Sequence, residues 1–166
     1  MATVERAQTE PEVGRPATAD FDALFREEGP RVYRTMYAFT GGRADVAEEA
    51  TAEAFARAIA QGAALRDPLA WIYRVAFRVA TDEVRRDRRR ADPVEGITAP
   101  PELLGVVDAL RRLSPNQRAA VVLHRVLGLP VEEVATRMGV AAPTVRVHLH
   151  RARARLRDLL GTEEDD

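Results

Sequence analysis

The chain has no cysteine and no lysine among its 166 residues. Without cysteine it has neither a disulfide framework nor a thiolate metal site, which is consistent with a reducing cytoplasm. Without lysine, all 25 basic side chains are arginines, whose planar forks bind phosphate and guanine through paired hydrogen bonds. Aromatic residues make up only 5% of the chain, so its core must consist mainly of Ala, Val and Leu.

Long hydrophobic runs are also missing. No uncharged stretch approaches the roughly 18 apolar residues that span a bilayer. The first twenty residues carry charges throughout and lack the apolar segment of a secretory signal. We therefore expect a soluble, cytoplasmic protein.

Motifs for catalysis and for metal binding are absent as well. The sequence has no HExxH, no Gly-rich phosphate loop and no Gly-x-Ser-x-Gly. His148 and His150 are two residues apart, so on a helix they point in different directions and cannot chelate one metal ion. We predict no cofactor, no metal site and no enzymatic activity, which leaves a small helical enzyme as a remote alternative.

Charge is strongly segregated along a chain whose net charge is only −1. Residues 66–90 contain eight arginines and four acids, and residues 111–157 contain ten arginines and two acids. Between them, residues 91–110 contain four acids and no arginine. Two basic blocks separated by an acidic break suggest two nucleic-acid contacts on one chain.

Periodicity predicts an all-α protein, in which two small helical domains are joined by a flexible acidic linker. The expected helices run from Asp20 to about residue 40, with a possible interruption at Gly29-Pro30, and over about 44–60, 67–90, 102–113, 115–127, 131–138 and 142–160. The expected divisions are a disordered tail (1–19), a first domain (20–91), the linker (92–101), a second domain (102–160) and an acidic tail (161–166).

Residues 131–153 read VEEVATRMGVAAPTVRVHLHRAR and predict a helix-turn-helix, with Gly139 in the turn. The second helix has an apolar side, which includes Val145 and Leu149, and an arginine-rich side suited to a DNA major groove. The residues that we expect to face DNA are Thr144, Arg146, Val147, His150, Arg151 and Arg153. The alternative is a solvated helical face with no ligand.

The helix expected at 67–90 also has a polar side. Its arginines and nearby surface suit single-stranded DNA, with guanidinium groups on phosphates. The candidate residues are Trp71, Arg74, Arg78, Asp82, Arg85, Arg86 and Arg89. Packing of Trp71 in the core and a solvated RRDRRR helix end (85–90) remain alternatives.

Two stretches together resemble a known family. These are DPLAWIYRVAFRVATDEVRRDRRR (67–90) and LSPNQRAAVVLHRVLGLPVEEVATRMGVAAPTVRVHLHRARARL (113–156). Their order and spacing resemble those of the extracytoplasmic function (ECF, group IV) sigma factors of the sigma-70 superfamily. The resemblance covers roughly residues 20–160. It implies a region 2 that binds the polymerase clamp and melts the −10 element, and a region 4 that reads the −35 element.

The resemblance also implies partners: core RNA polymerase through its β′ clamp and β flap, promoter DNA, and an inhibitory anti-sigma factor. Glu49, Glu53 and Arg57 are the expected polymerase contacts, with a plain solvated face as the alternative. The sequence departs from the family at Glu49, where Asp is usual, and at Ala52, where Gln is usual. It departs again at Phe77-Arg78, where Arg-Asn is usual, and at Val147-His148, where Ser-Arg is usual, so the resemblance does not imply which bases are read.

The sequence thus predicts a sigma factor that binds core RNA polymerase and directs promoter recognition and transcription initiation. The alternative is a stand-alone helix-turn-helix regulator, although such a protein has little use for a second basic helical domain. Because the acidic segment can act as a flexible tether, we expect the free chain to keep its two basic faces apart until a scaffold fixes their spacing.

Overall fold

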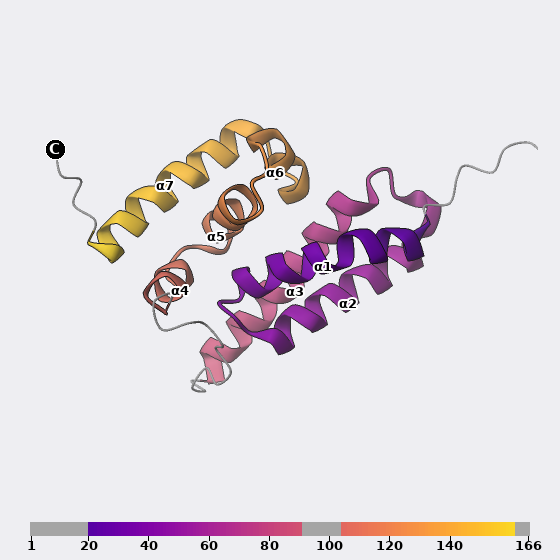
Figure 1. Cartoon of the computed structure of the whole chain (residues 1–166), viewed down its shortest axis with the longest axis horizontal. Coiled ribbons are helices and arrows are strands. Elements are labelled where there is room, and N and C mark those ends of the chain that lie inside the picture. Colours follow the sequence, from indigo (N-terminus) through magenta and orange to yellow (C-terminus); the bar gives the residue numbers. More distant parts are fainter. Residues whose placement is uncertain (1–19, 91–103, 162–166) are drawn as a thin grey trace, which may run out of the picture.

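The computed structural model describes residues 20–90 and 104–161, and for residues 87–90 it describes the helical backbone alone. Within these ranges the chain is helical and forms no strand, which confirms the predicted all-α class. Figure 1 shows the elements in two groups. The first contains α1 (Phe21–Phe39), α2 (Ala44–Gln61), the short η1 (Gly62–Ala64) and α3 (Pro68–Arg90). The second contains α4 (Leu104–Arg111), α5 (Pro115–Val121), η3 (Val122–Val126), α6 (Val131–Met138) and α7 (Ala142–Leu160).

The first helix begins and ends close to where the sequence predicts, and it has no break. The Asp20 carboxylate accepts a hydrogen bond from the Ala23 backbone N–H at 3.0 Å and caps α1. The interruption considered at Gly29-Pro30 is wrong, because α1 runs through Pro30 to Phe39. Gly29 and Val32 are buried on either side of the proline. Their packing holds the helix together across the one hydrogen bond that proline cannot donate.

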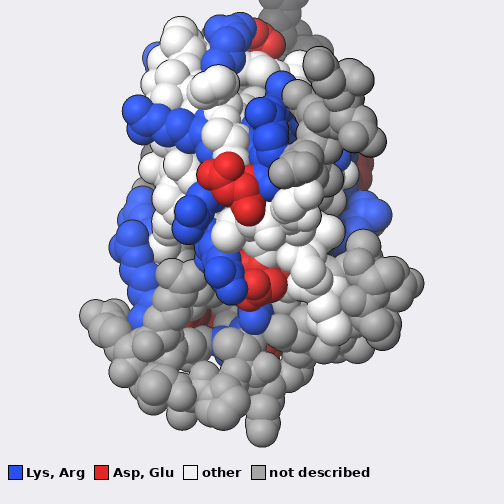
Figure 2. All heavy atoms as spheres, turned by 90° about the vertical axis from the view of Figure 1, so that its left-hand side faces the viewer, with Lys and Arg blue, Asp and Glu red and all other residues white. Residues whose placement is uncertain are grey.

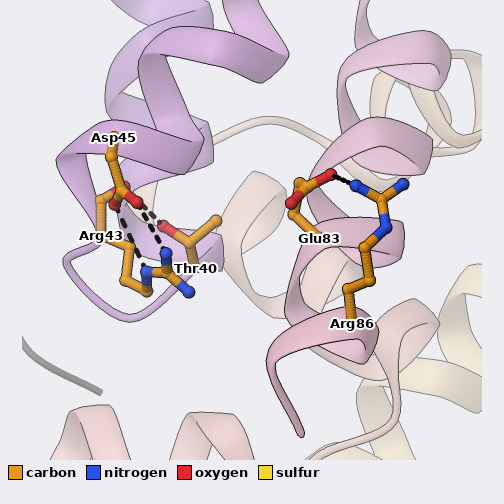
Figure 3. A network of polar contacts seen from close by, with 5 residues as sticks. All are labelled: Thr40, Arg43, Asp45, Glu83 and Arg86. Carbon is orange, nitrogen blue, oxygen red and sulfur yellow. Dashed lines mark hydrogen bonds and ion pairs between the residues drawn. The ribbon is translucent and has the colours of Figure 1, made fainter. Parts of the chain in front are cut away.

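A tight turn joins α1 to α2, and it uses two glycines with positive φ, Gly41 at 71° and Gly42 at 88°. Figure 3 shows Arg43 reaching the carboxylate of Asp45, with an Nη2 to Oδ2 distance of 2.6 Å. The Arg43 hydrogen bond lowers the pKa of Asp45 below its ordinary value. The side chain of Thr40 donates to the Arg43 carbonyl at 3.3 Å, so the turn is stabilised from both sides.

The sequence signals for α3 are confirmed. The Asp67 carboxylate accepts a hydrogen bond from the Ala70 backbone N–H at 2.9 Å, and Pro68 is the first helical residue. One side of the helix is fully buried against α1 and α2. That side carries Ile72, Tyr73, Ala76 and Ala80. The opposite side carries exposed arginines.

The second group contains the predicted helix-turn-helix, formed by α6 and α7. Gly139 ends α6 in the left-handed conformation, with a φ of 69°, and a proline stands in the first turn of α7. Ser114 and Gln117 form a reciprocal capping box at the start of α5. The single helix expected over 115–127 is interrupted in its second half, because α5 gives way at Val122 to the wider turn of η3.

The two groups pack against each other. One cluster of buried apolar side chains contains Val32 and Met36 of α1, Leu123 of η3, and Val134 of α6. The expectation that a tether keeps the two basic faces apart is therefore wrong for this structure. Apolar side chains of both groups are removed from water where the groups pack together, which is favourable. The charge pattern along the sequence carries no information about this burial. The predicted linker (92–101) and the tail at 1–19 lie outside the described residues, as does all of the acidic tail after Gly161.

Candidate nucleic-acid interface

The recognition helix α7 has the two sides that its sequence predicts. Val145 and Ala152 are fully buried, and Leu149 and Leu156 are half-buried on the same side. The predicted DNA-facing residues are all exposed: Thr144, Arg146, Val147, His150, Arg151 and Arg153. An exposed valine, 46% accessible, among arginines is suited to apolar contact with a base rather than to core packing. The helix has 19 residues, which is long enough to lie in a major groove.

One arginine of this face is oriented by the neighbouring helix. The Arg146 guanidinium donates to Glu132 of α6 over 3.0 Å, and both side chains are mostly exposed. Such an exposed pair contributes only about 0–1 kcal/mol to stability. The ion pair therefore holds the Arg146 side chain toward α6 and leaves it exposed to solvent.

The face of α3 opposite the core brings four of the predicted single-strand residues together. Arg74, Arg78, Asp82 and Arg85 are exposed and line one groove of about 350 Å³. Trp71 is half-buried and packs against the core, as the alternative for this residue proposed.

The remaining two arginines of the predicted single-strand set are farther along α3. Arg86 is exposed and is paired with Glu83 on the same helix, as Figure 3 shows. The side chain of Arg89 lies outside the described residues. Four members of the predicted set thus line the groove on α3, whose other lining residues come partly from α1, α5 and α6.

The acidic helix α2 presents the predicted polymerase contacts on its outer side. Glu49 is exposed, and Glu53 is half-buried and pairs with Arg57, with an Nε to Oε1 distance of 2.6 Å. Sequence reasoning missed an apolar patch between α1 and α2, where Phe25 and Ile59 are 51% and 57% exposed and line one pocket. Phe25 stacks edge-on against buried Phe55 with 4.9 Å between ring centroids, so the patch is held by the core.

Sequence reasoning also missed a buried arginine. Arg118 of α5 is only 3% exposed, although its neighbours in sequence suggest an ordinary polar helix start. Its guanidinium donates to the backbone carbonyls of Leu110, Arg111 and Phe39 at 2.8, 2.6 and 3.1 Å. No sequence pattern signals this role, because the acceptors are backbone atoms and one of them is 79 residues away.

Figure 2 shows arginines predominating over acidic side chains on the end of the molecule that it displays. Among the described residues no cluster of His, Asp and Glu could hold a metal ion, and no helix there is long and apolar enough to cross a membrane. Two helical groups, one with an arginine-rich face on α3 and one with a helix-turn-helix, are the combination typical of a helical nucleic-acid-binding protein.

Comparison with known proteins makes the class specific. Residues 24–90 match the protein family described as Sigma-70 region 2, and residues 103–156 match the one described as Sigma-70, region 4. Together the two matches cover both helical groups. The chain belongs to the ECF sigma factors of the sigma-70 family, as the resemblance of its motifs implies.

Curated relatives share about a third of their aligned residues with this chain. The ECF RNA polymerase sigma factor SigE of Mycolicibacterium smegmatis is 33% identical over 90% of this chain and 65% of its own length. SigM of Mycobacterium tuberculosis is 33% identical over 85% of this chain and 77% of its own length. SigI of the same species is 31% identical, and the alignment covers 48% of that protein. The chain thus spans about half the length of SigI and just under two-thirds of the length of SigE.

Two solved structures share the fold. The sigma factor RpoE of Bartonella quintana, crystallised with the anti-sigma factor NepR, aligns with a TM-score of 0.66 at 23% identity. The alignment covers 87% of this chain and 99% of that one. CnrH, solved with the cytosolic domain of CnrY, aligns with a TM-score of 0.65 at 24% identity over 87% of this chain and 89% of that one. Both share the two-part helical architecture.

Proposed function

We propose that this chain is a promoter-recognition subunit of bacterial RNA polymerase, which binds core polymerase and directs transcription initiation without catalysing a reaction itself. The observation that carries the proposal is the presence of two different arginine-rich helical faces, on α3 and α7, in one member of the ECF family. A promoter must be both read as duplex and opened, and the two faces suit these two tasks.

The upstream −35 element is assigned to the recognition helix. Arg146 and Arg151 of α7 are exposed and can form bidentate hydrogen bonds with guanine, while Val147 can contact a thymine methyl group. Thr144, His150 and Arg153 complete the exposed surface and suit phosphate or base contacts. Because Val147-His148 stands where Ser-Arg is usual in the family, the family's choice of bases is not carried over to this helix.

The −10 element is assigned to the groove face of α3. Arg74, Arg78 and Arg85 suit phosphates of the separated strand, and Asp82 can accept hydrogen bonds from base amino groups. Arg86 and Arg89 extend the same helix toward its end. Trp71 fits a packing role that supports this face, since it is half-buried against the core.

Core polymerase is assigned to α2 and to the second group. Glu49, Glu53 and Arg57 lie along the outer side of α2, where carboxylates suit a basic helix such as one of the β′ clamp. We assign binding of the β flap to the second group. The proposed domains are 20–91 for the first group and 102–160 for the second. The exposed apolar and charged faces also suit an anti-sigma factor, the kind of partner present in the solved RpoE complex. We place the chain in the cytoplasm, where these partners act.

The second candidate function is a stand-alone helix-turn-helix regulator, which α6 and α7 alone would support. A single reconstitution separates the two. Purified chain is mixed with core polymerase, complex formation is measured by gel filtration, and transcripts are counted from a library of promoter templates. The proposal expects a stable complex and promoter-dependent transcripts. Tight selective binding to duplex promoter DNA by the chain alone, with no complex with core, would establish the regulator instead.

A further inference from the structure

One ion pair joins the two helices of the helix-turn-helix among the residues that the structure describes. Nη2 of Arg146 on α7 lies 3.0 Å from Oε1 of Glu132 on α6. The two residues are 14 positions apart in sequence, and their side chains are 58% and 69% exposed. The pair therefore lies on the surface beside the recognition helix, and packing of the core does not require it.

The neighbouring acid of α6 makes a different contact. Glu133 pairs with Arg137 on the same helix at 3.6 Å, and the Arg137 guanidinium is turned inward over the ring of Tyr73. Glu132 and Glu133 both lie in the first turn of α6, where the helix dipole favours a carboxylate. The dipole accounts for two acids at this end of the helix. It does not account for the contact of Glu132 with an arginine of α7.

Arg146 lies where two kinds of DNA acceptor compete for it. It is the fifth residue of α7, and in a helix-turn-helix the first residues of the recognition helix contact base edges. The preceding helix, here α6, crosses the phosphate backbone in the same geometry. An arginine that reaches from the start of α7 to the first turn of α6 can therefore bind either a base edge or a phosphate. A phosphate contact carries no information about sequence, whereas a base contact does.

The Glu132 carboxylate changes the relative strength of these two contacts. It accepts one N–H of a guanidinium that has five, so the donors that a bidentate bond to guanine needs remain available. Guanine offers neutral acceptors, and its bond depends on the position of those donors. A phosphate is attracted mainly by net charge, and the carboxylate both cancels the charge of Arg146 and repels the phosphate. The pair thus weakens the phosphate contact more than the base contact.

We propose that Glu132 is a positioning residue that determines the sequence specificity of the recognition helix. It keeps Arg146 from binding the backbone of any duplex, so that this arginine contributes to binding where a guanine stands within its reach. The inference deepens the proposed function and rests on it, because it requires α7 to read duplex DNA. It adds a residue of α6, outside the predicted DNA-facing set on α7, to those that select the upstream element.

The first experiment measures binding of the full chain to a fluorescent duplex of scrambled sequence over a range of salt concentrations. Glu132→Gln keeps the size of the side chain and removes its charge, which frees Arg146 to neutralise one more phosphate. The slope of log K against log salt concentration should therefore steepen by about 0.9. At a fixed salt concentration the affinity should rise by roughly two- to fivefold, which is the range of an exposed ion pair.

A matched control is present in the same helical group. Asp108 and Arg112 of α4 form an ion pair at 3.1 Å, and their side chains are 61% and 58% exposed. Asp108→Asn removes the same charge and frees an arginine that is not on the recognition helix, so it should leave the slope unchanged. Circular dichroism on both variants checks that the helical content is that of the parent.

Two further variants test whether Glu132 acts through its charge and through Arg146. Glu132→Asp keeps the charge, so its affinity for the scrambled duplex should stay within about twofold of the parent's. In an Arg146→Gln background, Glu132→Gln should no longer change the slope, because no cation is freed. A change of equal size in that background would show that Glu132 acts on DNA by itself, and it would overturn the positioning role.

The second experiment selects duplexes from a library randomised over the upstream element, with the chain alone and with core polymerase. Glu132→Gln should lower the ratio of preferred to scrambled affinity by roughly two- to fivefold, and Asp108→Asn should not. An unchanged slope, an unchanged ratio or equal effects of the two variants would reject the proposal.

The outcome is separable from that of the proposed function. If Glu132→Gln shifts the slope and the ratio but core polymerase gives no promoter-dependent transcripts, the role of Glu132 stands and the proposed function fails. If transcripts depend on the promoter but Glu132→Gln behaves like Asp108→Asn, the role of Glu132 alone is rejected. A parent chain that prefers no upstream element, alone or with core polymerase, refutes duplex reading by α7 and the role of Glu132 with it.

Discussion

Replacement of Arg118 by alanine should destabilise the protein more than any surface arginine does. The side chain donates to carbonyls of Leu110, Arg111 and Phe39 at 3.1 Å or less, and to that of Leu113 at 3.4 Å. Each hydrogen bond from a charged donor contributes about 1.5–3 kcal/mol. The contributions do not add, because one cation makes all of them and its removal also ends its desolvation cost.

We therefore expect Arg118→Ala to lower the free energy of unfolding by about 3–5 kcal/mol, because it leaves several buried carbonyls without a donor, at about 1–3 kcal/mol each. That is a large part of the roughly 5–15 kcal/mol that stabilises a typical domain. Urea unfolding followed by circular dichroism measures the loss. Arg125→Ala, at an exposed arginine of η3, should change the free energy of unfolding by no more than about 0.5 kcal/mol.

The single tryptophan makes the same experiment report on the contact between the two groups. Trp71 lies in α3, far in sequence from Arg118, and its fluorescence follows unfolding of the first group. Because Arg118 completes the end of α1, the fluorescence midpoint should shift to lower urea together with the helical signal. A loss below about 1 kcal/mol would refute the reasoning about the buried carbonyls. An unmoved fluorescence midpoint would refute the coupling between the groups.

Three further predictions address the two DNA faces, polymerase binding and pH. Arg151→Ala should reduce promoter use by holoenzyme and relax preference at one upstream base by about 1–3 kcal/mol; unchanged selectivity across a library of upstream elements would reject this contact. Glu49→Arg with Glu53→Arg should weaken binding to core polymerase while leaving the helical content unchanged, and the parent's binding should weaken with salt; equally tight binding by the double mutant would place the site elsewhere. Burial raises the pKa of Tyr73 above its ordinary value of 10.0, so the phenol of the unfolded chain ionises first as pH rises. Stability present below pH 10 should therefore fall above it, and Tyr73→Phe should make that fall shallower in urea unfolding measured across this range.

Local signals in the sequence determined most of the helices and both basic faces. Asp67 before Pro68, Ser114 with Gln117, and Gly139 between two amphipathic segments act within a few residues of themselves, so their effects can be predicted without the fold. The exposed arginines of α7 follow from periodicity in the same way, because the buried side of a helix fixes its opposite side.

Only the tertiary structure decided how the two halves meet. The continuation of α1 through Pro30 depends on burial of its neighbours, and the burial of Arg118 depends on the end of a helix 79 residues away. The placement of Arg137 over Tyr73 likewise joins two groups that the sequence separates by an acidic segment. Composition and periodicity describe each helix by itself. The contact between the two groups arises from apolar burial and from a carbonyl left at a helix end, and these groups acquire partners only when the chain is folded.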